Sequence, residues 1–187
     1  KKLTLIGLTI FLTVIFLLPV NVLAGGSSDT CDTKYPIVMA HGMGASAEIL
    51  GIVDYWWGIP DALEDEGAEV FITSVNAMDS TRAKAEDFKN QFLQIKAATG
   101  ASKLNIIGHS HGCIYTRDAV SNLGLYPYVQ SHTSIAGPHR GSALADIIVG
   151  IVPDSMEFMV GDTANFLYGF INGDTDPDSL GNAYDIT

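Results

Sequence analysis

Residues 104–112 read Leu-Asn-Ile-Ile-Gly-His-Ser-His-Gly, and this stretch decides the fold class of the chain. The apolar run at 104–107 predicts a buried strand, and Gly108 and Gly112 bracket Ser110 in the pattern G-x-S-x-G. Glycine is needed on both sides, because a strand and a helix approach closely at so tight a turn. We therefore expect Ser110 in a strained backbone conformation, with its hydroxyl above the carboxyl end of a parallel sheet.

Strands and helices alternate on both sides of this stretch. Short apolar or β-branched runs predict further strands at 36–40, 70–75 and 131–136. Helical periodicity, caps and terminal glycines predict helices at 60–66, from Asp79 or Ser80 to Gly100, and at about 112–122. This alternation predicts an α/β fold, with a mostly parallel sheet covered by helices on both faces. Four strands are few for such a sheet, so we expect it to be incomplete at its carboxyl end.

The composition fits one acidic globular domain. The chain has 187 residues, 47% of them hydrophobic, and we place the domain at 35–187. Lys1 and Lys2 are two of the ten basic residues and no acid precedes residue 25, so the remainder carries eight bases against 21 acids. A surface this acidic repels phosphate backbones, which excludes nucleic acid as a partner.

The first 24 residues have the pattern of a secretory signal peptide. Two lysines precede an uncharged run at 3–18, and Ala24 is followed by small residues. We expect cleavage after Ala24, a polar leader at 25–34, and secretion through the periplasm. The alternative is an uncleaved membrane anchor, because residues 3–24 reach the length of about 20 that crosses a bilayer.

A second glycine-containing loop, residues 41–44, directly follows the first predicted strand. Backbone N–H groups stabilise the negative charge that develops in acyl transfer, and this loop can bring the amide of Met43 beside that of His111. The two amides would then form an oxyanion hole for a reaction at Ser110. The alternative is an ordinary strand-to-helix loop.

Four stretches resemble, in order, the secreted true lipases of Gram-negative bacteria, lipase family I: 35–43 (YPIVMAHGM), 53–60 (VDYWWGIP), 104–112 (LNIIGHSHG) and 137–142 (GPHRGS). The resemblance extends over about residues 33–150. It implies the α/β-hydrolase fold, hydrolysis of carboxylic esters with a preference for triacylglycerols, Ser110 as nucleophile, and the amides of Met43 and His111 as the oxyanion hole. The sequence departs from the family at 113–115 (CIY), where glycine and smaller residues are usual, so the shape of the acyl pocket stays open.

The resemblance places the acid and the base of the catalytic triad beyond a lid. Residues 143–187 contain no histidine, so we expect both groups to be absent from this chain and the chain by itself to be almost inert. The structural calcium site of the family belongs to the same absent part, so we expect no cofactor or metal within this chain. A lipid or ester substrate and a dedicated lipase foldase are the partners that the resemblance implies.

A serine nucleophile needs a base, and the chain has five histidines. His109 and His111 flank the serine, but neighbours on so sharp a turn point their side chains away from its hydroxyl. His41 is expected to order the glycine-containing loop, and His132 to be structural within a strand. His139 follows the end of a strand and could in principle reach the site, although the resemblance assigns its stretch, 137–142, to packing.

The sequence gives little support for a metal site or for a disulfide bond. The H-x-H pair at 109–111 has Cys113 nearby but no acid close in sequence, which disfavours zinc. Acidic residues at 174–185 imitate the spacing of a calcium loop that Pro177 interrupts, so a solvated acidic loop is expected. We expect Cys31, in an exposed leader, and Cys113, in a buried helix, to be free thiols.

Residues 143–171 are apolar beyond the need of a surface helix, and they follow the fourth strand, where a lid over the site would be inserted. Ordinary core helices are the alternative.

The sequence thus predicts a secreted serine hydrolase, a lipase or carboxylesterase, that forms an acyl-enzyme on Ser110. Two alternatives stay open: another acyl-transfer enzyme of the same fold, such as a polyester depolymerase or an acyltransferase, and a noncatalytic binding protein on the same scaffold.

Overall fold

The computed structural model describes residues 29–43, 48–49, 53–76, 78–142 and 185. The predicted signal peptide at 1–24 and the predicted lid at 143–171 lie outside the described residues. Within the part of the chain that is described, no helix has the length and apolar character needed to cross a membrane.

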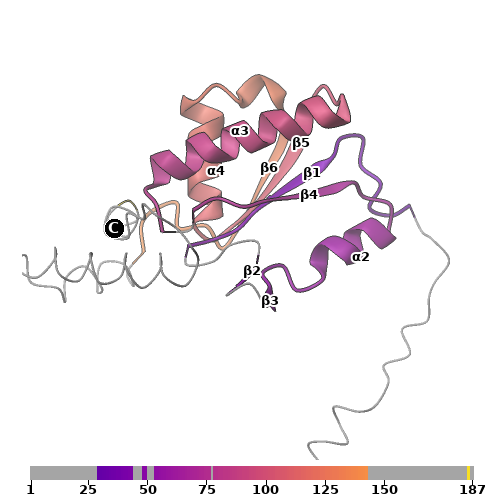
Figure 1. Ribbon diagram of the computed structural model, residues 1–187, viewed down its shortest axis with the longest axis horizontal. Helices are drawn as coiled ribbons and strands as arrows, with labels where there is room; N and C mark the ends of the chain where they lie inside the picture. Colours follow the sequence, from indigo (N-terminus) through magenta and orange to yellow (C-terminus); the bar gives the residue numbers. More distant parts are fainter. Residues whose placement is uncertain (1–28, 44–47, 50–52, 77, 143–184, 186–187) are drawn as a thin grey trace, which may run out of the picture.

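Four parallel strands form the main sheet in the order β4-β1-β5-β6 (Figure 1). They are β1 (Ile37–Ala40), β4 (Val70–Thr73), β5 (Leu104–His109) and β6 (Val129–Ile135). β4 pairs with one side of β1 and β5 with the other, so the chain changes its direction across the sheet after β4. The carboxyl ends of β1 and β5 therefore flank the crevice in which sheets of this kind bind ligands.

Helices cover both faces of this sheet. α3 (Thr81–Thr99) and α4 (Gly112–Asn122) lie on one face and α2 (Ile59–Asp65) on the other (Figure 1). The Ser80 hydroxyl caps α3 by accepting a hydrogen bond from the Ala83 amide at 3.3 Å, and Gly100 ends the helix in the left-handed conformation. The predicted α/β fold, with a mostly parallel sheet and helices on both faces, is confirmed.

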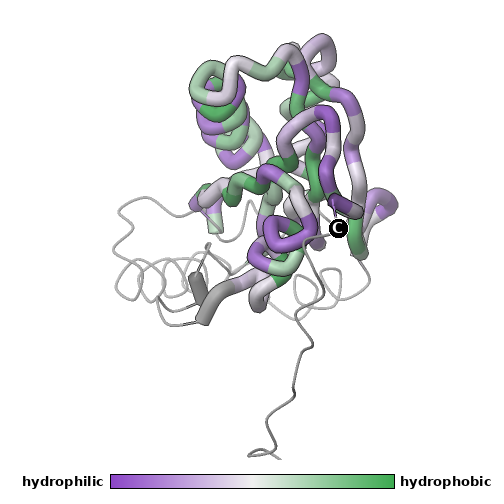
Figure 2. Tube along the Cα trace, turned by 90° about the vertical axis from the view of Figure 1, so that its right-hand side faces the viewer, coloured by the Kyte–Doolittle hydropathy of each residue, from purple (hydrophilic) through white to green (hydrophobic). Residues whose placement is uncertain are grey.

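Each face of the sheet has its own hydrophobic core, because successive residues of β1 point to opposite faces. Val38 and Ala40 pack beneath α3 and α4, whereas Ile37 and Met39 pack with Trp56 on the face of α2. Figure 2 shows the hydrophobic segments along the strands at the centre and mixed segments along the helices. The continuous apolar run at 37–40 is thus that of a strand buried on both faces.

The shortest elements and several strand boundaries differ from the sequence prediction. β1 begins one residue later than predicted, β4 ends at Thr73 rather than at 75, and β5 continues to His109 rather than ending at 107. β6 begins at Val129 rather than at 131, because Val129 pairs with Leu104 across an irregular register. It ends at Ile135, since Ala136 has φ 51°, which does not continue a strand. Three short elements were not predicted, because two or three residues show no periodicity: the antiparallel pair β2 (Glu48–Ile49) and β3 (Val53–Asp54), and the 3-10 turn η1 (Tyr126–Tyr128).

The leader is not fully exposed where it is described. Cys31 is half-buried and packs against the core on the face of α2. Its amide donates a hydrogen bond to the carbonyl of Glu66, just after α2, at 2.8 Å. The expectation of an exposed Cys31 was therefore wrong, because a backbone hydrogen bond ties this part of the leader to the domain.

The two glycines of the G-x-S-x-G stretch allow backbone segments to touch. A Cβ on Gly112 would lie 2.3 Å from the carbonyl oxygen of Ala40, and one on Gly108 would lie 2.9 Å from the amide nitrogen of Cys113. Both obstacles are backbone atoms, which cannot rotate away as the end of a side chain can. The absence of side chains here is what lets α4 start directly against β1.

We predict that Gly112→Ala destabilises the folded protein by about 2–4 kcal/mol, because its methyl group would overlap the Ala40 carbonyl. Gly100→Ala is the matched control: Gly100 has φ +67° and open space around it, so only backbone strain of about 1 kcal/mol is expected. Urea unfolding of both variants checks this. Equal losses in the two would mean that close packing is not the constraint at Gly112.

Candidate active site

Ser110 occupies the turn between β5 and α4 in a strained conformation. Its φ is 54°, in the left-handed region that residues other than glycine rarely adopt. The turn is held on both sides, because the Ser110 amide donates to the carbonyl of Ile135 at 2.9 Å and its carbonyl accepts from the amide of Cys113 at 3.1 Å. The backbone geometry expected for this serine is therefore present.

The loop that follows β1 lies against this serine. A Cβ on Gly42 would be 2.9 Å from the Ser110 Cβ and 3.3 Å from its Oγ. Within the described residues, no group accepts a hydrogen bond from the amide of Met43 or from that of His111. These are the two amides that the sequence predicts as an oxyanion hole, and both follow strands whose ends meet at the same crevice.

His41 orders the loop from within. Its Nε2 accepts a hydrogen bond from the Val75 amide at 3.1 Å, so its Nδ1 carries the proton and donates to the carbonyl of Gly42 at 2.9 Å. Burial lowers the pKa of the ring, and the positive charge of Lys84 acts in the same direction. The neutral ring therefore holds one tautomer and one orientation.

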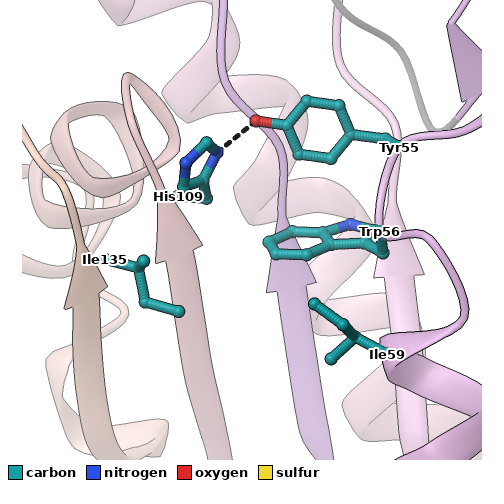
Figure 3. Close-up of a pocket in the computed structure, with 5 residues that line it drawn as sticks. All are labelled: Tyr55, Trp56, Ile59, His109 and Ile135. Carbon is teal, nitrogen blue, oxygen red and sulfur yellow. Dashed lines mark hydrogen bonds between the residues drawn. The ribbon is translucent and has the colours of Figure 1, made fainter.

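Tyr55 bridges this loop and the serine turn. Its hydroxyl accepts a hydrogen bond from the Gly42 amide at 3.0 Å and also bonds to Nδ1 of His109 (Figure 3). Below it, Trp56 and Ile59 line an apolar pocket of about 250 Å³ together with Ile135 (Figure 3). Tyr55 lies in the lipase-like stretch 53–60, but no sequence pattern indicated a role for it.

Lys84 holds the side chain of His111 from behind the site. Its side chain is fully buried, and its Nζ donates to Nδ1 of His111 at 3.1 Å. Nε2 of His111 therefore carries the ring proton and donates to the hydroxyl of Thr81 at 2.8 Å. Burial first, and then the charge of Lys84, lower the pKa of His111 to about 3, so this ring stays neutral.

Lys84 was also missed by sequence reasoning, although a signal for it existed. It precedes Phe88 by one helical turn, so it is a charged residue on the apolar stripe of α3. A buried lysine needs a partner, and the pattern alone did not show that His111 would be that partner.

Each of the five histidine rings has a hydrogen-bond partner other than the Ser110 hydroxyl. His109 contacts Tyr55, and His41 and His111 are held as described above. His132 bonds to the hydroxyl of Thr116 at 2.8 Å. His139, whose stretch the resemblance assigns to packing, contacts the Ser134 hydroxyl at 2.7 Å and Arg117 at 3.1 Å.

The described residues contain no group of three or more His, Cys, Asp or Glu side chains arranged to hold a metal ion. Both ring nitrogens of His111 already take part in hydrogen bonds, to Thr81 and to Lys84. The acidic stretch at 174–184 lies outside the described residues.

Both cysteines are free thiols. The Cys113 thiol is buried and donates to the carbonyl of Gly108 at 3.0 Å.

Known proteins resemble this chain in sequence and in fold. A sequence profile of the alpha/beta hydrolase fold matches residues 35–174. Triacylglycerol lipases of Vibrio cholerae and Pseudarthrobacter phenanthrenivorans are 42% and 35% identical over 65% and 64% of this chain. The chain spans 38% of the length of each of these relatives. The mature form of the Bacillus licheniformis lipase BlEst2 superposes with a TM-score of 0.58 at 19% identity, over 86% of this chain and 56% of that one, which is a likeness of fold.

We predict that Lys84 makes stability depend on pH. Burial lowers its pKa from 10.5 to about 7, against the opposing charges of Asp79 and Asp185. Between these two pH values the unfolded chain binds a proton that the folded chain does not, so the free energy of unfolding rises with pH by at most about 1.4 kcal/mol per unit. Below pH 7 both states are protonated and this contribution is constant.

Lys84→Met removes the titrating group, so the difference in unfolding free energy between wild type and variant should be flat below pH 7. It should then grow in favour of the wild type as the pH rises from about 7 towards 10.5. Urea unfolding at several pH values measures it. A difference that stays constant across this range would contradict the prediction.

Proposed function

Because the chain belongs to the alpha/beta hydrolase fold family, we propose that the whole protein is a serine hydrolase that cleaves carboxylic esters, above all triacylglycerols, through an acyl-enzyme on Ser110. The observation that carries the proposal is the strained Ser110 turn packed against Gly42, with the amides of Met43 and His111 donating to no group in the described part of the chain. Relatives named triacylglycerol lipases support the choice of substrate.

The proposed reaction has two halves. Ser110 Oγ attacks the ester carbonyl carbon while a general base takes its proton, and the carbonyl oxygen becomes an oxyanion that the amides of Met43 and His111 stabilise. Collapse expels the alcohol, which receives that proton, and leaves the acyl-enzyme. Water then attacks the acyl carbon with the same base, which releases the fatty acid and restores the serine.

The side chains around Ser110 have roles other than proton transfer in this mechanism. All five histidines are held by other partners, so we assign the general base and its acid partner to residues of the whole protein other than these five. Lys84 and Thr81 fix the ring of His111 at both nitrogens, which keeps its backbone amide in place for the oxyanion. A calcium site and a lipase foldase are further expectations for the whole protein, based on the family resemblance.

We predict that Ser110→Ala lowers kcat for p-nitrophenyl butyrate and for emulsified tributyrin by about 10⁴-fold or more in the full-length protein. Ser134→Ala is the matched control, because Ser134 lies on β6 and its hydroxyl contacts His139, which has no role in the proposed mechanism; its kcat should stay within about threefold of wild type. A fluorophosphonate should add its mass to the peptide that contains Ser110. Labelling of another residue, or turnover retained in Ser110→Ala, would refute the proposed nucleophile.

We also propose that the protein is exported and cleaved after Ala24. The two lysines, the uncharged run and the small residues that follow support this. Mass spectrometry of the secreted protein should find Gly25 at the amino terminus. An intact amino terminus recovered from the membrane fraction would support the anchor instead.

A further inference from the structure

Two tyrosine hydroxyls hold the peptide group that joins His41 to Gly42, one at each end. The Tyr115 hydroxyl donates to the His41 carbonyl oxygen at 2.9 Å, and the Gly42 amide donates to the Tyr55 hydroxyl at 3.0 Å. Tyr115 belongs to α4 and is fully buried, whereas Tyr55 is half-buried in the turn after β3. Groups from two distant parts of the chain therefore fix the orientation of one peptide plane.

The next peptide group has a partner for its carbonyl but, among the residues that the structure describes, none for its N–H. Nδ1 of His41 donates to the Gly42 carbonyl at 2.9 Å. The Met43 amide, at the other end of this peptide, donates to no group within the described residues. The C=O and N–H of a trans peptide point in opposite directions, so the bond to the Gly42 carbonyl turns the Met43 N–H away from the His41 ring.

From these contacts we propose that Tyr55 and Tyr115 are positioning residues, which clamp the His41–Gly42 peptide and so aim the Met43 amide at the reacting carbonyl oxygen. This inference rests on the proposed function, in which that amide stabilises the oxyanion. A donor that is already aimed does not have to reorganise during the reaction, and such preorganisation is where an oxyanion hole gains its effect.

The surroundings of both tyrosines suit this role. Burial raises the pKa of Tyr55 and of Tyr115, so both hydroxyls keep the proton that a neutral clamp requires. A Cβ on Gly42 would lie 2.9 Å from the Tyr55 hydroxyl and equally close to the Ser110 Cβ, so the clamped peptide adjoins the nucleophile directly. Tyr115 also lies in the segment 113–115 that departs from the lipase pattern, where a smaller side chain would not reach the His41 carbonyl.

The test compares Tyr55→Phe, Tyr115→Phe and the double variant in the full-length protein. Tyr126→Phe is the matched control, because Tyr126 is 74% exposed on η1 and far along the chain from the loop. Active sites are counted by titration with a fluorophosphonate, and kcat and KM are measured with p-nitrophenyl butyrate. The inhibition constant of an alkyl trifluoromethyl ketone, whose adduct places an oxyanion in the hole, is measured on the same samples.

We expect kcat per titrated site to fall about tenfold in each single variant, with KM changed by less than about twofold. The inhibition constant should rise in proportion to the loss of kcat, which a purely structural role would not produce. The double variant should lose less than the product of the single losses, because breaking one bond already frees the peptide. Tyr126→Phe should match the wild type.

An unchanged kcat per titrated site in Tyr55→Phe would overturn the clamp, as would a loss confined to the amount of folded protein. If Tyr115→Phe does not fold, Tyr55→Phe decides alone, because its half-buried ring tolerates the change. Ser110→Ala is assayed beside them: turnover retained there refutes the proposed function itself. Turnover abolished there, with both tyrosine variants unaffected, refutes the clamp only.

Discussion

The close contact between the first turn of α4 and the carboxyl end of β1 is the constraint on which the rest of the structure depends. Only a residue without a side chain fits at Gly112, because the Ala40 carbonyl occupies the space that a Cβ would need. This contact places the serine turn and the loop after β1 side by side as backbone. Side chains then hold that arrangement from outside it, and none has to enter the space between the two segments.

The groups that hold the site are polar, yet they lie in an apolar interior. His41, His111, Thr116 and Lys84 are buried, and each has a hydrogen-bond partner. Such a network rigidifies a core when every member is satisfied and destabilises it when one partner is lost. Burial keeps both rings neutral, so Lys84 is the group of this set that carries a charge, with a pKa of about 7. The rigidity of the loop and its sensitivity to substitution thus have the same origin.

The sequence was sufficient for the features that local rules determine. The five-residue pattern G-x-S-x-G identifies Ser110 and its two glycines. Periodicity and capping residues predict the main strands and helices. Tyr55 and Tyr115 could not be recognised in this way, because their partners lie 13 and 74 residues away. Hydrogen bonds of this range depend on the order of strands in the sheet, and a single sequence does not state that order.

The central pairing of the sheet joins β1 to β5, which follows it by more than 60 residues, and Ala40 lies beside Gly108. During synthesis, residues 37–43 leave the ribosome well before the partners that order them. Until those partners arrive, β1 is an apolar segment without neighbours, and the loop after it has no fixed direction. Long-range parallel pairing also closes slowly. An unfolded chain therefore holds no partly assembled site, and the loop after β1 meets the serine turn only when the sheet has closed.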